Sequence, residues 1–131
     1  GELSAEVRAE LTLRTDSTVL FGLVRDARRR LPQAPLVEAL EAGVGVLAAA
    51  ADAAQVPANL VCVASDGREL ALVRRGVRAK PNTLHLLRED DACWVASEPL
   101  DDRRWEAVPP DTSLTLALDP RTSVLTEEDP R

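Results

Sequence analysis

The spacing of apolar residues changes from helical to extended near Pro57, and this change constrains the fold of the chain more than any other feature. Before Pro57 the apolar residues recur at the intervals of amphipathic helices, and after Ala58 they form short extended runs. Pro32 and Pro35 interrupt the helical part. We expect a short helix over residues 4–13, a second one that begins at the capping residues 15–17 and continues to about residue 31, and a third over 36–54.

Three pairs of extended segments follow, each joined by residues typical of turns. The segment 65–68, Ser-Asp-Gly-Arg, has the chemistry of a β-hairpin turn. The expected pairs are 59–65 with 69–74, 83–88 with 92–97, and 112–118 with 122–126. Helices followed by hairpins predict the α+β class, with a helical layer packed on a mainly antiparallel sheet.

Composition excludes several kinds of function. The 131 residues, 45% of them apolar, fit one compact domain. Twenty-two acidic and sixteen basic residues give a formal charge of −6, which argues against a nucleic-acid surface because such a surface needs positive charge. The sequence has no run of 18 apolar residues and no signal-like N-terminus, so we expect no membrane span and a cytoplasmic location. Cys62 and Cys93 lie in apolar runs and are interpreted as small buried residues in a reducing compartment.

The sequence offers little support for catalysis or metal chemistry built wholly within this chain. His85 is the only histidine, it lies on an expected strand, and no Gly-x-Ser-x-Gly motif is present. Two separated cysteines and one histidine match no metal-ligand spacing. We therefore expect a structural histidine, no metal and no cofactor.

The segment 43–48, Gly-Val-Gly-Val-Leu-Ala, matches the dinucleotide-binding fingerprint, and Asp66 follows near the expected distance. That fingerprint requires a strand immediately before its glycines. Here Glu38 and Glu41 precede them at helical spacing, so we expect a helix whose glycines permit close packing on a neighbour. A dinucleotide-binding module remains an alternative.

Charged residues at the two ends of the second helix are candidate sites. Asp16 either caps the helix or meets a substrate ammonium group. Arg25, Arg28, Arg29 and Arg30 gather in the last turns, where cations complement the helix dipole. We interpret that cluster as a solvated helix end rather than an anion site.

Four segments in the same order and spacing resemble class II glutamine amidotransferases, and specifically the small single-domain branch that includes the ergothioneine-pathway γ-glutamyl hydrolase. Together they cover nearly the whole chain. They are Thr15-Asp16-Ser17-Thr18-Val19-Leu20-Phe21, Asn59 to Gly67, Leu84-His85-Leu86-Leu87-Arg88, and Val95-Ala96-Ser97-Glu98-Pro99-Leu100-Asp101-Asp102 followed by Trp105 and Val108-Pro109. The last is the most specific.

The resemblance implies part of the four-layer αββα N-terminal-nucleophile sandwich, with residues 1–131 as the C-terminal half of a glutamine amidotransferase type 2 domain. In the family an N-terminal cysteine attacks the γ-carbonyl of glutamine or a γ-glutamyl group, its α-amine acts as base, and an Asn-Gly pair binds the oxyanion. This sequence contains none of these parts, starts at Gly1 and has no methionine. We therefore expect no catalytic residue in it, and a nucleophile on a missing N-terminal segment or a separate chain.

The resemblance also implies a substrate site at Asp16 and Thr15, because the family's aspartate at this position binds the α-ammonium of the glutamyl substrate. Thr18 departs from the glutamate common there, and Ser97 and Glu98 are expected to have structural roles. The function implied is glutaminase or γ-glutamyl amide hydrolase activity, with an ergothioneine-pathway γ-glutamyl intermediate as the specific substrate. A non-catalytic partner subunit of such an enzyme remains a second alternative.

Overall fold

Two helices precede seven strands in the part of the chain that the computed structural model describes, residues 16–90, 92–119 and 124–128. The α+β class and the helices expected at 15–31 and 36–54 are confirmed. The short helix expected over 4–13 lies outside the described residues. The elements are α2 (Asp16–Arg30), α3 (Leu36–Ala53), β1 (Ala58–Ser65), β2 (Glu69–Val77), β3 (His85–Glu89), β4 (Ala92–Ala96), β5 (Glu106–Ala107), β6 (Thr112–Asp119) and β7 (Val124–Glu128).

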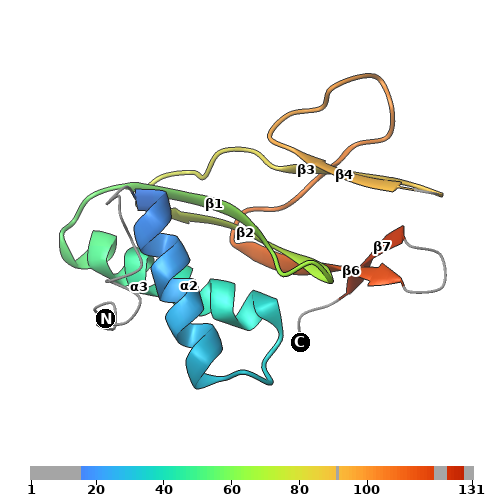
Figure 1. Ribbon diagram of the computed structural model, residues 1–131. Helices are drawn as coiled ribbons and strands as arrows, with labels where there is room; N and C mark the ends of the chain where they lie inside the picture. The colour runs from blue at the N-terminus through green and yellow to red at the C-terminus, as the bar shows by residue number, and fades with distance from the viewer. Residues whose placement is uncertain (1–15, 91, 120–123, 129–131) are drawn as a thin grey trace.

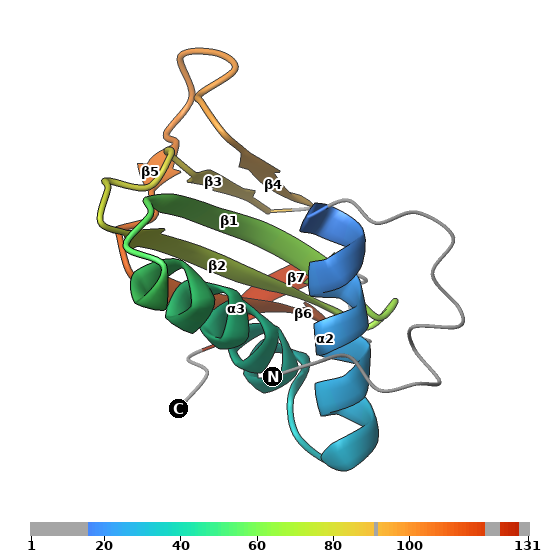
Figure 2. The same ribbon diagram turned by 90° about the vertical axis from the view of Figure 1, so that its left-hand side faces the viewer.

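The strands pair antiparallel in two separate sheets. A four-stranded sheet has the order β1-β2-β6-β7, and a three-stranded sheet has the order β4-β3-β5. The three hairpins expected from the sequence are therefore present. Figure 1 shows α3 on one side of the four-stranded sheet and the three-stranded sheet on the other side, and Figure 2 shows α2 running across the strands rather than along them. This helix–sheet–sheet order is consistent with part of the sandwich that the resemblance implies.

The sequence does not predict β5. This strand pairs with the start of β3 through His85 with Ala107 and Leu86 with Glu106. A strand of two residues leaves no periodicity to detect, so its pairing could not be expected from spacing alone.

Alternating side chains of β2 face two different cores, which is why the layers stack in this order. Ala71 and Val73 face the helices and pack in one core with Leu40 of α3. Leu72 faces the other way and packs between the sheets with Leu86 of β3. Successive side chains of a strand point to opposite faces, so a central strand that is apolar on both faces must be covered on both.

The β1–β2 turn also positions the start of α3. Gly67 adopts a φ of 87°, a conformation that glycine tolerates without strain. Asp66 Oδ1 accepts hydrogen bonds from the backbone nitrogens of Arg68 at 2.9 Å and Glu69 at 3.1 Å. Glu69 Oε1 in turn accepts the backbone N–H of Leu36 at 2.9 Å. A carboxylate at a helix N-terminus satisfies an unpaired N–H and complements the helix dipole.

Buried Arg74 joins the four-stranded sheet to the segments that enter and leave the three-stranded sheet. The residue is 4% exposed, and its guanidinium donates three hydrogen bonds to backbone carbonyls. Nε donates to the Asn82 oxygen at 2.8 Å, Nη1 to the Val108 oxygen at 2.6 Å, and Nη2 to the Pro81 oxygen at 3.1 Å. A buried charge is tolerated only when oriented dipoles replace the lost water, and here three carbonyls do so.

The exchange Arg74→Met is expected to lower the free energy of unfolding by about 2–4 kcal/mol, because it leaves carbonyl acceptors without donors. The neighbouring Arg75 is exposed, so Arg75→Met is a matched control with an expected effect below about 0.5 kcal/mol. Urea unfolding of both variants measures the difference. Equal stability of the two variants would contradict the role assigned to Arg74.

Helix α3 approaches α2 closely at Gly43. A Cβ added there would lie 3.0 Å from Val24 Cγ2 and 3.3 Å from Leu20 Cδ1, whereas a Cβ at Gly45 would meet nothing within 4 Å. The expectation that the glycines permit close packing is therefore confirmed for Gly43, and it is wrong for Gly45.

These two glycines should respond in opposite directions to substitution. Gly45→Ala is expected to stabilise the protein by about 0.5–1 kcal/mol, because alanine favours a helix interior and has free space here. Gly43→Leu is expected to destabilise it by about 1–3 kcal/mol, because the side chain must displace α2. Thermal unfolding of the pair measures both effects, and a stabilised Gly43→Leu variant would refute the close approach.

Candidate functional site

The sequence places its candidate substrate site at the start of α2. Asp16 is the first residue of that helix. Its side chain, like the whole of Thr15, lies outside the described part of the chain. The ammonium-binding role of these two residues therefore stays a prediction.

A cavity of about 620 Å³ lies between α2 and β1 and reaches Ser17, the residue after Asp16. Its lining extends along α2 from Ser17 to Arg28, or about 16 Å of helix. We call it the α2–β1 groove. Most of its walls are apolar, and Phe21 on α2 and Val63 on β1 remain 57% and 49% exposed. Such a groove next to Asp16 has the size of a small-molecule site.

Two charged residues that line the α2–β1 groove form an ion pair. Arg28 Nη2 lies 2.9 Å from Asp66 Oδ2. Burial opposes ionisation of Asp66, but hydrogen bonds from the backbone nitrogens of Arg68 and Glu69, together with Arg28, outweigh it and lower the pKa of that carboxyl. Among the described residues, buried Arg28 Nη1 has no hydrogen-bond partner. This buried nitrogen belongs to a residue that lines the groove.

The arginine cluster at the end of α2 is only partly a solvated helix end. Arg29 and Arg30 are exposed, as expected. Arg28, by contrast, is half-buried and pairs with a residue 38 positions away, and the Arg25 guanidinium lies 5.7 Å from the Phe21 ring centre. The sequence gives no signal for the pairing of Arg28, because Asp66 looks like an ordinary turn residue.

Neither cysteine is activated as a nucleophile. Cys62 lines the α2–β1 groove, and burial raises the pKa of its thiol. Burial also raises the pKa of the Cys93 thiol, although the nearby Arg88 partly opposes that shift. The thiolate is the reactive form, so a raised pKa makes both residues poor nucleophiles.

The segment with the most specific resemblance has clear structural roles. Trp105 Nε1 donates to Asp101 Oδ1 at 2.9 Å, and Arg103 pairs with Asp101 at 2.8 Å and Glu89 at 2.6 Å. Hydrogen bonds from Arg103 and Trp105 lower the pKa of Asp101 to about 2. The Arg103 guanidinium also lies 4.9 Å from the Trp94 ring centre. These contacts fasten the loop after β4 to the three-stranded sheet.

His85 and Ser97 belong to the same structural unit. The Ser97 carbonyl accepts a hydrogen bond from Thr83 Oγ1 at 2.8 Å and lies 3.2 Å from His85 Nδ1. This arrangement agrees with a structural role for both residues.

The geometry that a dinucleotide fingerprint requires is not formed at Gly43 and Gly45. Both lie inside α3, which begins at Leu36, so a helix rather than a strand precedes them. Asp66 is used in the β1–β2 turn and in the ion pair with Arg28.

In residues 16–90, 92–119 and 124–128, no group of three or more His, Cys, Asp or Glu side chains could hold a metal ion. Neither helix in the described ranges is both long and apolar enough to span a bilayer.

Comparison with known proteins supports the relationship suggested by the sequence. No protein-family model matches the chain, and no curated protein matches it. Among solved structures, it is similar to a glutamine aminotransferase class-II domain protein from Silicibacter pomeroyi, with a TM-score of 0.75 and 25% sequence identity over 97% of this chain. The match covers 56% of that protein, so the present chain spans little more than half its length.

The chain therefore shares the fold of that glutamine aminotransferase class-II domain protein, with helices followed by antiparallel hairpins. The likeness supports the family suggested by the four sequence segments.

The Arg28–Asp66 pair should make stability depend on pH in a defined direction. Because the pKa of Asp66 is lowered on folding, its stabilising contribution is present above its unfolded pKa of about 3.9 and is lost as the pH falls through the folded pKa. Asp66→Asn should thus cost about 0.5–1 kcal/mol at pH 7, a value reduced by partial solvent exposure, and much less near pH 2.5. Urea unfolding at both pH values measures this, with Asp102→Asn as the exposed control. A pH-independent cost would contradict it.

Proposed function

We propose that this chain forms the C-terminal half of a class II glutamine amidotransferase domain, and that the complete protein hydrolyses glutamine or a γ-glutamyl amide. The observation that carries the proposal is the fold likeness over 97% of the chain, with a TM-score of 0.75, to a glutamine aminotransferase class-II domain protein. The four ordered sequence segments point independently to the same class.

In this proposal the nucleophile is a cysteine outside these 131 residues, on a preceding segment or a separate chain. The raised thiol pKa values of Cys62 and Cys93 support this, because both residues stay protonated near neutral pH. The external thiolate attacks the γ-carbonyl and the amine leaves with a proton. Water then hydrolyses the thioester to release glutamate and regenerate the thiol.

The part of this chain in catalysis is to bind the substrate. We assign the α-ammonium of the glutamyl group to Asp16, with Thr15 beside it, and the remainder of the substrate to the α2–β1 groove. The volume of the groove, about 620 Å³, and its contact with Ser17 support this assignment. A charge-assisted hydrogen bond contributes about 1.5–3 kcal/mol, which is enough to select substrates with a free α-amino group.

Within the class, the specific substrate proposed is a γ-glutamyl intermediate of ergothioneine biosynthesis. The segment from Val95 to Asp102 supports this branch, because it carries the most specific resemblance. A non-catalytic partner subunit is the second candidate, and the absence of an activated cysteine among the described residues is equally compatible with it.

In the complete gene product, Asp16→Asn should raise the KM for a γ-glutamyl amide at least about tenfold, because the neutral side chain loses the charge of the ammonium contact. Asp52→Asn removes an exposed carboxylate at the far end of α3 and is the matched control. Glutamate release measures both variants, and the 131-residue chain alone should release none. An unchanged KM for Asp16→Asn would refute the ammonium role, and turnover by the short chain would refute the external nucleophile.

A further inference from the structure

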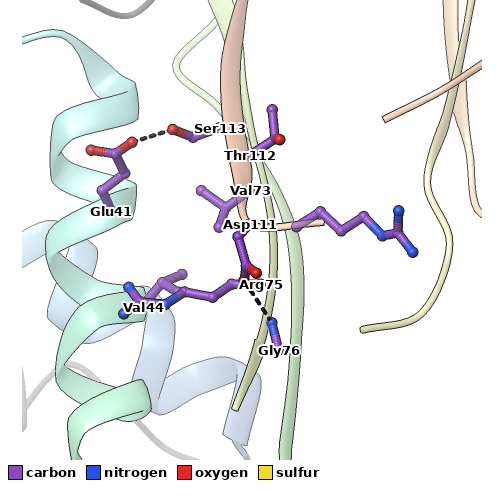
Figure 3. Close-up of a pocket in the computed structure, with 9 residues that line it drawn as sticks. Glu41, Val44, Val73, Arg75, Gly76, Asp111, Thr112 and Ser113 are labelled. Carbon is purple, nitrogen blue, oxygen red and sulfur yellow. Dashed lines mark hydrogen bonds between the residues drawn. The ribbon is translucent and has the colours of Figure 1, made fainter. Parts of the chain in front are cut away.

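A second cavity, of about 600 Å³, lies where α3 crosses the end of β2 and the start of β6. Figure 3 shows its lining, with Asp111 turned toward Gly76, the Arg75 side chain reaching toward Val44 of α3, and Glu41 directed from α3 toward Ser113. We call it the Arg75 pocket. None of its lining residues lines the α2–β1 groove. The two cavities are therefore separate candidate sites.

Arg75 supplies the pocket with a free cation. Alternation along β2 places Arg75 on the same face as Val73, toward the helices, and Arg74 on the opposite face. Each nitrogen of the Arg74 guanidinium donates to one backbone carbonyl. No hydrogen bond or ion pair joins Arg75 to any other residue in the described ranges, so its guanidinium can bind a ligand carboxylate in two-point geometry.

Two carboxylates line the same pocket, and each is held by its own backbone or side-chain contact. Asp111 has a φ of 55°, which aspartate tolerates better than most residues, and its Oδ1 lies 3.4 Å from the Gly76 nitrogen. Glu41 accepts a hydrogen bond from Ser113 Oγ. These contacts hold both carboxylates in the pocket. Neither carboxylate forms an ion pair with Arg75.

The backbone at Gly76 is fixed by close contact. A Cβ on Gly76 would clash with the Ala79 carbonyl oxygen and with Pro81. This close approach fixes the end of β2 that carries Arg75. Asp111 and Glu41, which already have hydrogen bonds, lose little conformational freedom when a ligand arrives.

We propose that the Arg75 pocket binds a free α-amino acid with a second cationic group, such as lysine. The carboxylate pairs with Arg75, the α-ammonium with Asp111, and the side-chain cation with Glu41. Arg75 reaches across the pocket toward Val44, Asp111 lies at Gly76, and Glu41 projects from α3, so the three groups surround one space that an amino acid can enter. Two arginines and two acidic residues line the pocket, and because Arg74 is hydrogen-bonded to three carbonyls, Arg75, Asp111 and Glu41 are the charged groups left for a ligand.

Three analogues of lysine, each without one charged group, test the proposal on the full protein. Cadaverine lacks the carboxylate, 6-aminohexanoate lacks the α-ammonium, and norleucine lacks the side-chain ammonium. L-Lysine should bind and shift the Gly76 amide resonance, and each analogue should bind at least about tenfold more weakly by calorimetry. No binding of lysine at about 1 mM, or equal binding of any analogue, would overturn the assignment. In particular, equal binding of 6-aminohexanoate would indicate a peptide C-terminus instead.

Variants assign each contact. Arg75→Met should bind cadaverine and lysine with equal affinity. Asp111→Asn should bind 6-aminohexanoate and lysine with equal affinity. Glu41→Gln should bind norleucine and lysine with equal affinity. Asparagine suits position 111 because it too tolerates a positive φ. Arg68→Met removes an exposed arginine from the β1–β2 turn and should leave lysine binding unchanged. A variant that keeps the full preferences of the original protein refutes the contact assigned to it. The tests at Asp16 do not involve this pocket, so either proposal can fail alone.

Discussion

The guanidinium of Arg74 is the interaction on which the arrangement of the two sheets depends. The guanidinium projects from β2 on the face opposite the helices. It donates to carbonyls of the segment that precedes β3, at Pro81 and Asn82, and of the segment that follows β5, at Val108. Apolar contacts between the sheets are not directional and would permit sliding. Three charge-assisted hydrogen bonds with fixed geometry remove that freedom, since each carbonyl must stay within reach of one nitrogen.

Local patterns were sufficient to predict most of the elements. The helical spacing from Val19 to Leu31, and the Ser65-Asp66-Gly67-Arg68 turn, are determined by residues close in the sequence. The contacts of Arg74 and the pairing of Arg28 with Asp66 were not predictable, because their partners lie up to 34 and 38 positions away. β2 also extends to Val77, three residues beyond the expected end, because it pairs along its length with β1.

The two candidate sites also differ in whether the sequence indicates them. The sequence singled out Thr15 and Asp16 through a resemblance, and their side chains lie outside the described residues. It gave no sign of the Arg75 pocket, which combines α3, β2 and β6 and exists only once the sheet has formed. An arginine, a glutamate and an aspartate spread over 70 positions form no sequence motif, and only the packing of α3 on the sheet brings them to one pocket.

The position of β1 has a consequence for what can pair with the four-stranded sheet. In the described part of the four-stranded sheet, β1 is an outer strand, and its eight residues from Ala58 to Ser65 include no charged side chain and no proline. Natural sheets commonly protect such an edge with lysine, proline or a bulge, and β1 contains no lysine and no proline. Its outward backbone groups are a ready template for one more strand. A strand that completes the sheet and a second copy of this chain would compete for the same row of amides.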